Sequence, residues 1–437
     1  MAFPANKTMV ETTLAKIKFP RIRRFFPFTI LAILGPGLIA TAAGNDAGGI
    51  ATYASAGAHF GLSVLWIMTF LTVGFVLIQE MAARLGAATG KGFSDLIREN
   101  FSLRMTVFMM SLLLLGNIGL VVSEFAGIAA SLELLGITKY ISVPVGAVVI
   151  WFLIVKGNYP KVEKIFLLMS GFLLSYIFAA ILAKPDWNSV AINLIRPSVS
   201  PDPEFFLFTV ALIGTTIAPF MQVFAQSAVV EKGITMSDFK YTRIDTLIGT
   251  LFANLVAIFI IIATASTLFP AGIRIDTAAD AATALVPFAG EFARILFALG
   301  LLGASLLAAG VVPLTTSFAL ANAFGWEAGI NRSFEEAPIF YAMFTFIIVL
   351  SATIVLSPAL SLIKLLVGLQ VVNGLLLPIQ LYFMLKLANN KNLMGKHVNP
   401  VWFNSIVIIT MIVVTVAVFL FLGSSIVTLF QSYSGIN

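Results

Sequence analysis

Long apolar runs recur along the whole chain, at lengths suited to crossing a lipid bilayer. A membrane-spanning helix needs about 20 consecutive residues that are mostly apolar. Only 11% of the residues are charged and the mean hydropathy is +1.01, which excludes a surface that faces water on all sides. The sequence predicts eleven spanning helices, near residues 29–57, 62–86, 105–135, 141–156, 162–183, 204–231, 243–269, 292–324, 338–357, 360–388 and 402–430.

Positive charge is distributed unevenly between the loops that join these runs. Lys and Arg concentrate on the cytoplasmic side of membrane proteins. If the N-terminus lies inside, only six of the 26 Lys and Arg residues fall outside, namely Lys139, Lys184, Arg196, Arg274, Arg294 and Lys364. This bias predicts a protein integral to the cytoplasmic membrane, with a cytoplasmic N-terminus and an outside C-terminus. Residues 1–28 are then a cytoplasmic segment, and residues 29–437 form one transmembrane transport domain.

Two of the predicted helices are interrupted near their middle. The first contains Gly44, Gly48 and Gly49 around Asp46, and the sixth contains Pro219. Paired glycines weaken a helix, and proline removes a backbone donor and clashes with the preceding turn. Broken helices five spans apart indicate an inverted repeat with a binding site at the two breaks.

This pattern predicts an all-α polytopic membrane protein with the LeuT-type 5+5 inverted repeat. Repeat one is expected over about residues 29–183 and repeat two over about residues 204–388. An extra eleventh helix, at about residues 402–430, would lie outside the repeat.

Asp46 is the most informative charged residue inside a predicted span. A carboxylate near the middle of the membrane is costly and marks a functional site by default. The surrounding glycines free backbone carbonyls to join it in an oxygen-rich cation site, and aspartate also suits the N-cap of a second half-helix. By contrast, Glu80 and Arg84 are four residues apart near the end of their span, which predicts a local ion pair.

The first interrupted helix also carries a recognisable motif. The stretch GPGLIATAAGNDAGGIATYASAGA at residues 35–58 resembles the first helix of the NRAMP family of divalent-metal transporters, with DAGG at 46–49 where the family has DPGN. Glu124 in helix three, Gln370 in helix ten and LMGKHVNPVW at 393–402 continue the match. Their order and spacing extend the resemblance across most of the chain.

The resemblance implies a set of metal-site residues at the two breaks. They are Asp46, Gly49 and the carbonyl of Ala43 at the first break, Thr215 and Ala218 at the second, and Gln370 in helix ten. Gly49 stands where the family has asparagine, and Ala218 stands where it has methionine. Matching the sixth helix from its other end shifts the register by one residue, and neither register places a methionine at the site.

These departures favour magnesium. A thioether is a soft ligand that suits transition metals, whereas Mg²⁺ keeps several waters around one or two carboxylates. Loss of the asparagine and the methionine leaves a wider site with one carboxylate and several carbonyls. The chain is similar in this respect to the NRAMP-related magnesium transporters, a branch of the same superfamily. That resemblance implies import of Mg²⁺ and Mn²⁺, as transported substrates and not as cofactors.

Few residues near the breaks could carry a proton. Val121, Phe220 and Gln226 stand where the resemblance places titratable groups, and neither histidine lies at a break. Glu124 is the remaining carboxylate, and together with Gln226 and Asn45 it is the expected proton path or polar lining. We therefore expect uptake that is not obligatorily coupled to protons.

Two other transport functions stay open at this point. One is a proton-coupled Mn²⁺ or Fe²⁺ symporter of the NRAMP type, and the other is a sodium-coupled symporter for amines or amino acids on the same scaffold. No enzyme is expected, because the sequence offers no plausible nucleophile–base pair and no cysteine. The expected partners are the metal ion and the lipid bilayer, with no nucleic acid and no obligatory protein partner.

Overall fold

A computed structural model describes residues 44–156, 168, 171–329, 332–358 and 361–434 of the chain. The predicted cytoplasmic segment, Ala43 and the first half of the first predicted helix lie outside these residues. All regular elements within the described ranges are helices. Eight of the described segments are long and apolar enough to cross a membrane.

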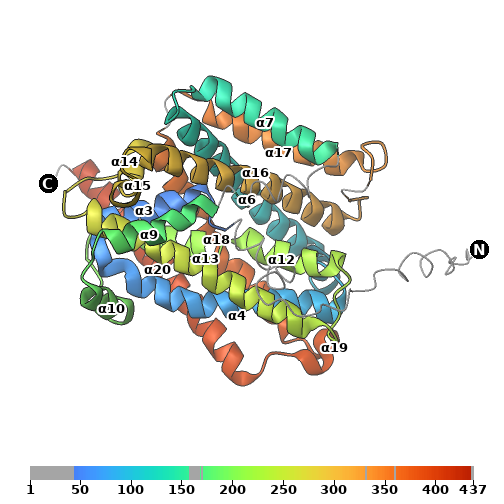
Figure 1. The fold of residues 1–437 in the computed structure, drawn as a ribbon. Coiled ribbons are helices and arrows are strands. Elements are labelled where there is room, and N and C mark those ends of the chain that lie inside the picture. Colours follow the sequence, from blue (N-terminus) through green and yellow to red (C-terminus); the bar gives the residue numbers. More distant parts are fainter. Residues whose placement is uncertain (1–43, 157–167, 169–170, 330–331, 359–360, 435–437) are drawn as a thin grey trace, which may run out of the picture. The chain divides into compact units, whose positions relative to one another are not determined.

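The long helices follow the predicted apolar runs (Figure 1), except for the fifth run, much of which lies outside the described residues. Their bounds are α3 Ala47–Phe60, α4 Leu65–Thr89, α6 Leu103–Glu133, α7 Lys139–Val155, α11 Pro203–Thr216, α12 Pro219–Glu231, α13 Phe239–Thr267, α16 Ala293–Phe324, α17 Pro338–Val355, α18 Leu362–Ala388 and α20 Val401–Ser434. Short helices lie between them: α5 Phe93–Asn100, α9 Ser175–Leu182, α10 Trp187–Ile195, α14 Ala278–Thr283, α15 Val286–Ala289 and α19 Lys391–Met394.

The predicted interruption of the sixth helix is present. Helix α11 ends at Thr216, and α12 begins at Pro219. Ile217 leaves the helical conformation with φ −122° and ψ 54°, although its N–H still donates to Ile213. Proline suits the first position of a helix because its missing N–H would have no partner there. The sequence therefore ends one half-helix and starts the next within two residues.

Helix α3 begins immediately after Asp46, at the first predicted break. Asp46 has an extended backbone, with φ −73° and ψ 179°, and α3 starts at Ala47. The residues that would form the preceding half-helix are not among those described. The interruption on that side of Asp46 stays a prediction.

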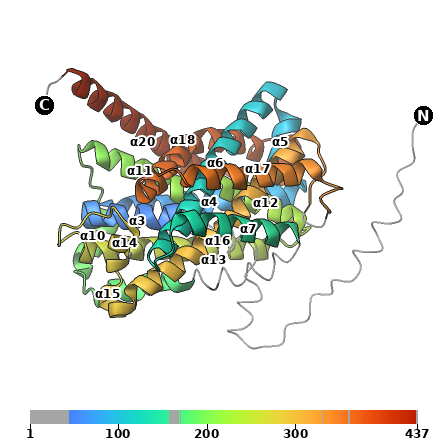
Figure 2. The same cartoon turned by 90° about the horizontal axis from the view of Figure 1, so that it is seen from above.

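Two long helices pack against the half-helices. Helix α13 packs along α3 and α4, and α18 packs against α3, α6 and α11. Seen from above, α11, α18 and α20 lie side by side (Figure 2). These contacts bring the start of α3 and the end of α11 into the interior, where both are buried.

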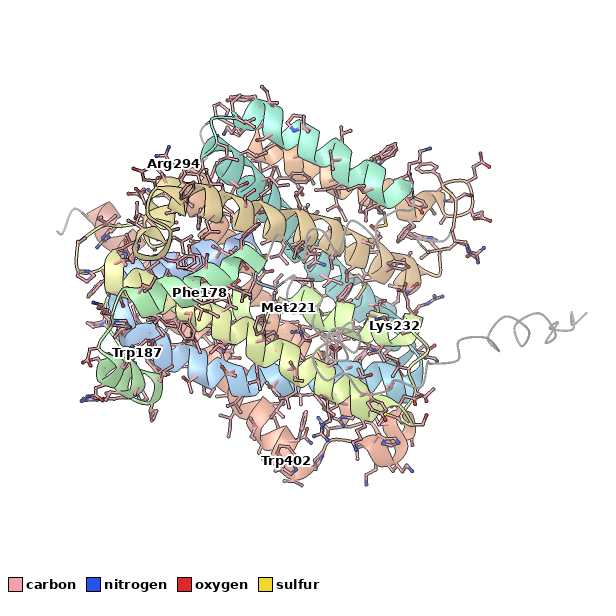
Figure 3. The ribbon with its side chains drawn as sticks, in the orientation of Figure 1. Phe178, Trp187, Met221, Lys232, Arg294 and Trp402 are labelled. Atoms are coloured by element: carbon pink, nitrogen blue, oxygen red, sulfur yellow. The ribbon has the colours of Figure 1, made fainter. Side chains whose placement is uncertain are left out.

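The exterior of the helices is apolar, as expected for a protein in lipid. Trp187 and Trp402 are 47% and 54% exposed, whereas Met221 is 1% exposed (Figure 3). In the most apolar stretch of α20 only 22% of the residues are buried. Because water would oppose such a surface, these faces belong against lipid tails. The chain is an integral membrane protein.

Candidate cation site at the helix breaks

Asp46 is the N-cap of α3. Its Oδ1 accepts a hydrogen bond of 2.6 Å from the N–H of Gly49, and the residue is only 2% exposed. The N-terminus of a helix carries a partial positive charge, which stabilises a carboxylate there. Capping uses only part of the acceptor capacity of a carboxylate, which has about four lone-pair sites. Asp46 can therefore cap α3 and still bind a cation.

A second carboxylate reaches the same helix end from α6. Glu124 is fully buried, and its Oε2 accepts from the N–H of Ala47 at 3.3 Å. Asp46 and Glu124 thus accept from amides two residues apart in the first turn of α3. Two buried negative charges at one helix end repel each other unless a cation or a proton neutralises one of them. The arrangement favours a positively charged ligand.

The space above Gly49 is surrounded by oxygen atoms. A Cβ built at Gly49 would lie 2.8 Å from Thr215 Oγ1, 3.1 Å from Asp46 Oδ1 and 3.3 Å from the carbonyl oxygen of Gly44. We call these three oxygens the oxygen cradle. It combines a hydroxyl, a carboxylate and a carbonyl, which are the ligand types that Mg²⁺, Ca²⁺ and Mn²⁺ accept. Glycine leaves the cradle open, because any side chain would enter it.

Gln370 of α18 lies at the crossing of the two half-helices. A Cβ at Gly48 would overlap the Gln370 side-chain amide, and a Cβ at Gly214 would overlap its backbone carbonyl. The Gln370 Oε1 accepts from Asn373 Nδ2 at 3.1 Å, and it is Nε2 that approaches Gly48. The predicted carbonyl ligand is thus next to the first break, but its oxygen would reach a cation there only after the amide rotates.

The remaining predicted residues lie at different distances from the cradle. Ala218 is the buried N-cap of α12, and its carbonyl already accepts from the N–H of Met221 at 3.0 Å. Gln226 is two helical turns further on and donates to the carbonyl of Lys91 at 2.9 Å. This contact joins α12 to the segment between α4 and α5, and the predicted part of Gln226 in a proton path stays a prediction. The predicted carbonyl of Ala43 lies outside the described residues.

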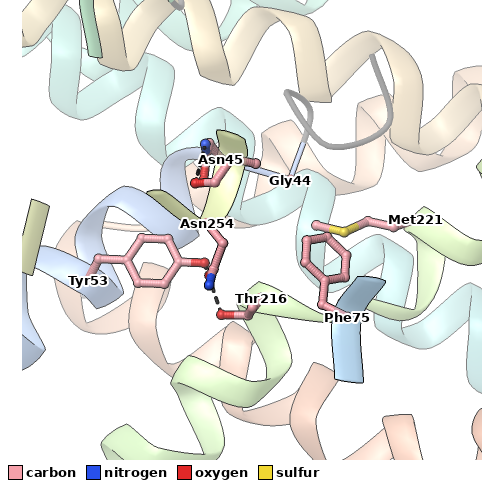
Figure 4. A pocket seen from close by; sticks show the side chains of 8 residues that line it. Gly44, Asn45, Tyr53, Phe75, Thr216, Met221 and Asn254 are labelled. Carbon is pink, nitrogen blue, oxygen red and sulfur yellow. Dashed lines mark hydrogen bonds between the residues drawn. The ribbon is translucent and has the colours of Figure 1, made fainter. Parts of the chain in front are cut away.

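A small cavity of about 10 Å³ adjoins the cradle. Its lining residues are Gly44, Asn45, Tyr53, Phe75, Thr216, Met221, Ala253 and Asn254 (Figure 4). This volume suits about one water molecule. Asn45 lines the cavity as predicted and donates to the carbonyl of Ala253 at 3.2 Å.

Sequence reasoning missed the polar contacts of this cavity. Tyr53 Oη and Thr216 Oγ1 are 3.1 Å apart and share a hydrogen bond, which joins α3 to the end of α11. Tyr53 lies seven residues after Asp46, on the same face of α3, so helical periodicity could have identified it. Asn254 of α13 donates to the carbonyl of Met68 at 3.2 Å, a contact that no pattern in the sequence indicates.

Known proteins similar to this chain are transporters. The chain is 28% identical to a divalent metal cation transporter MntH of Clostridium acetobutylicum, over 90% of this chain and 91% of the relative. It is 29% identical to that of Deinococcus radiodurans, over 66% and 67%. The MntH of Bacillus subtilis is 26% identical, over 95% and 96%.

Solved structures show the same fold. A manganese transporter of Eremococcus coleocola has a TM-score of 0.71 at 20% identity, covering 95% of this chain and 90% of that one. Mhp1, a nucleobase-cation-symport-1 family transporter, has a TM-score of 0.57 at 12% identity, covering 91% and 90%. These likenesses confirm the predicted LeuT-type fold. Residues 37–424 match the Nramp family, described as natural resistance-associated macrophage protein-like, and the chain belongs to that family.

Proposed function

We propose that this chain imports Mg²⁺, and Mn²⁺ by the same path, across the cytoplasmic membrane. Its Nramp relatives are divalent metal cation transporters and not enzymes, which supports transport of a divalent metal ion. The observation that carries the proposal is the oxygen cradle above Gly49, beside the buried carboxylate of Asp46. The three atoms that form the cradle are all oxygens, the ligand type that Mg²⁺ prefers.

The cradle suits an ion that keeps part of its hydration shell. Mg²⁺ binds six oxygens at about 2.0–2.1 Å and dehydrates reluctantly. Three protein oxygens leave the other positions to water, and the adjoining cavity has room for about one. Gly49 and Ala218 lack the amide and thioether that the wider family offers, and so we place the chain in the magnesium-transporting branch of the superfamily.

The two half-helices also favour a cation between them. Helix α11 ends near the cradle, and the carbonyls at a helix C-terminus attract cations. The N-terminus of α3 would repel a cation, and the carboxylates of Asp46 and Glu124 offset that repulsion. The proposed ligands are therefore Asp46, Thr215 and backbone carbonyls of the first break, with Gln370 joining after its amide rotates.

The membrane potential alone supplies enough free energy to drive uptake of a divalent ion without coupling to protons. On the proposed orientation, with the N-terminus inside, a divalent ion gains about 4.6 kcal/mol from a membrane potential of about 100 mV. This corresponds to an accumulation of about two-thousandfold at equilibrium. A proton gradient is unnecessary for import of an abundant ion such as Mg²⁺.

Proton coupling is the second candidate, and one contact favours it. Glu124 accepts from the first turn of α3 next to Asp46, and two carboxyl groups so placed can hold one proton between them. Uptake of the ion would then displace that proton. Proton flux during uptake separates the two functions.

The function is tested with variants that separate two roles of Asp46, its negative charge and its hydrogen bond as the N-cap of α3. Asp46→Asn keeps a good N-cap and removes the charge, while Asp46→Ala removes both. We expect both variants to lose saturable Mg²⁺ and Mn²⁺ uptake into proteoliposomes, with Asp46→Ala also less stable by about 1 kcal/mol. Asp186→Asn, at the N-cap of α10, is the matched control and should transport normally.

Two results would contradict the proposal. Uptake by Asp46→Asn with an unchanged half-saturation concentration would show that the carboxylate is not a ligand. Saturable uptake of a labelled amine that depends on a sodium gradient, with no metal uptake, would instead support the symporter function.

A further inference from the structure

A second group of metal-ligating side chains lies at the end of α3 remote from Asp46. His59, Asp202 and Glu204 each place one ligand atom within 4.8 Å of the other two. His59 is the penultimate residue of α3, whereas Asp202 and Glu204 lie at the start of α11. His59 is thirteen positions after Asp46, and a helical rise of 1.5 Å per residue places the two about 20 Å apart.

The three side chains are held by different contacts. The His59 ring lies against Phe60 and Phe208, with ring centroids 4.6 Å and 5.7 Å away, and its side chain is 11% exposed. Asp202 caps α11 by accepting from the N–H of Glu204 at 2.9 Å. His59 and Asp202 are therefore positioned, while the 53% exposed side chain of Glu204 can adjust.

The Glu204 carboxylate lies between the His59 ring and the Arg274 guanidinium. Its Oε2 is 2.7 Å from His59 Nε2 and 3.5 Å from Arg274 Nη1. A metal ion that replaced the proton between His59 and Glu204 would bind both atoms at once. With neutral histidine the three ligands carry a charge of −2, and Arg274 competes with a metal for the same carboxylate.

We propose that His59, Asp202 and Glu204 form a binding site for Zn²⁺ that joins the end of α3 to the start of α11. One imidazole and two carboxylates suit Zn²⁺, which binds nitrogen and oxygen at about 2.0–2.2 Å, and leave a fourth position for water. Mg²⁺ prefers oxygen ligands alone and is a poor match for the imidazole. The exposed side chain of Glu204 can adjust to complete the site.

Zn²⁺ at this site would connect the two half-helices that border the oxygen cradle. An ion fixed at their remote ends would restrain their relative movement and slow uptake. This consequence rests on the proposed function, whereas binding of Zn²⁺ does not. The two parts can therefore fail separately.

Binding is tested with the full chain in detergent by titration calorimetry with Zn²⁺. In the Asp46→Ala background, which removes the proposed transport site, we expect one Zn²⁺ to remain bound. Adding His59→Gln or Glu204→Gln should weaken that binding at least tenfold, and Asp202→Asn should weaken it while keeping the α11 cap. Glu327→Gln, an exposed acid paired with Arg332, is the matched control and should change nothing.

Arg274→Gln provides the distinguishing measurement. Because it removes the competing cation, it should tighten Zn²⁺ binding several-fold, a gain that a damaged fold would not produce. Zn²⁺ should also slow Mn²⁺ uptake by the otherwise unmodified chain more strongly than uptake by His59→Gln, in which Zn²⁺ can compete only at the transport site. The site is refuted if Asp46→Ala binds no Zn²⁺ at millimolar concentration, or if adding His59→Gln and adding Arg274→Gln to Asp46→Ala both leave its Zn²⁺ binding unchanged.

Discussion

Replacing Gly49 by alanine tests the oxygen cradle with one added methyl group. The new Cβ would lie 2.8 Å from Thr215 Oγ1, which is too close for a carbon atom. Threonine is stiff at χ1, and the other neighbours, Asp46 Oδ1 and the Gly44 carbonyl, are held by the cap and the backbone. The methyl group can be accommodated only if the cradle itself moves.

The stability change should be small and the transport change large. Overpacking costs about 1–3 kcal/mol, and alanine regains about 0.5–1 kcal/mol of helix propensity at this position in α3. The net loss is then about 0–2.5 kcal/mol. Since the methyl fills the space between the three oxygens, we expect the half-saturation concentration for Mg²⁺ to rise at least tenfold, equivalent to about 1.4 kcal/mol.

The assay is Mg²⁺ uptake into proteoliposomes loaded with a magnesium indicator. Gly368→Ala in α18 is the control, because a Cβ there meets open space. Adding Thr215→Ala to Gly49→Ala removes the closest clash, so it should recover stability but not uptake. Normal half-saturation in Gly49→Ala, or full recovery of uptake in the double variant, would refute the assignment of these oxygens as ligands.

Three further predictions concern selectivity, coupling and stability. Gly49→Asn with Ala218→Met restores the family's amide and thioether and should shift preference from Mg²⁺ towards Mn²⁺ in competition uptake; an unchanged ratio would show that these positions do not set it. A pH dye inside vesicles at fixed voltage should report no acidification driven by Mg²⁺ or Mn²⁺; acidification that Glu124→Gln abolishes would establish coupling. Arg84→Met should lower the free energy of unfolding in detergent by up to about 3–5 kcal/mol, because it leaves the buried Glu80 with only the 3.6 Å contact of the exposed Arg243. A loss below about 1 kcal/mol would mean that the pair behaves like a surface ion pair.

The Arg84 prediction shows what local sequence reveals and what it does not. The spacing of four predicted the pair with Glu80, and the structure confirms it, with Arg84 Nε 3.1 Å from the carboxylate. The remaining contacts of Arg84 come from the distant LMGKHVNPVW segment. Its two other nitrogens donate to the His397 carbonyl at 2.7 Å and to Asn399 Oδ1 at 2.6 Å. Contacts that span more than 300 residues depend on tertiary packing, which no local spacing encodes.

In the candidate site, too, the features set by local sequence were predictable and the contacts set by tertiary packing were not. The break at Pro219 and the cap at Asp46 were predictable because proline, glycine and aspartate act on their own backbone. The approach of Glu124 to the N–H of Ala47 was not, since it depends on how α6 packs on α3. The contact of Gln226 with the Lys91 carbonyl also depends on packing, and its part in a proton path stays a prediction.

The close approach of α18 to both half-helices limits how they can move. Gln370 contacts Gly48 of α3 with its side chain and Gly214 of α11 with its backbone, at a separation that admits no side chain on either glycine. Interfaces packed this closely repack between discrete arrangements and do not deform gradually. A shift of α18 must therefore disturb both half-helices in the same step. Gln370 thus contacts both half-helices at once. If α3 moves away from α18 while α11 stays, or the reverse, Gln370 must first lose its contact with Gly48 or with Gly214.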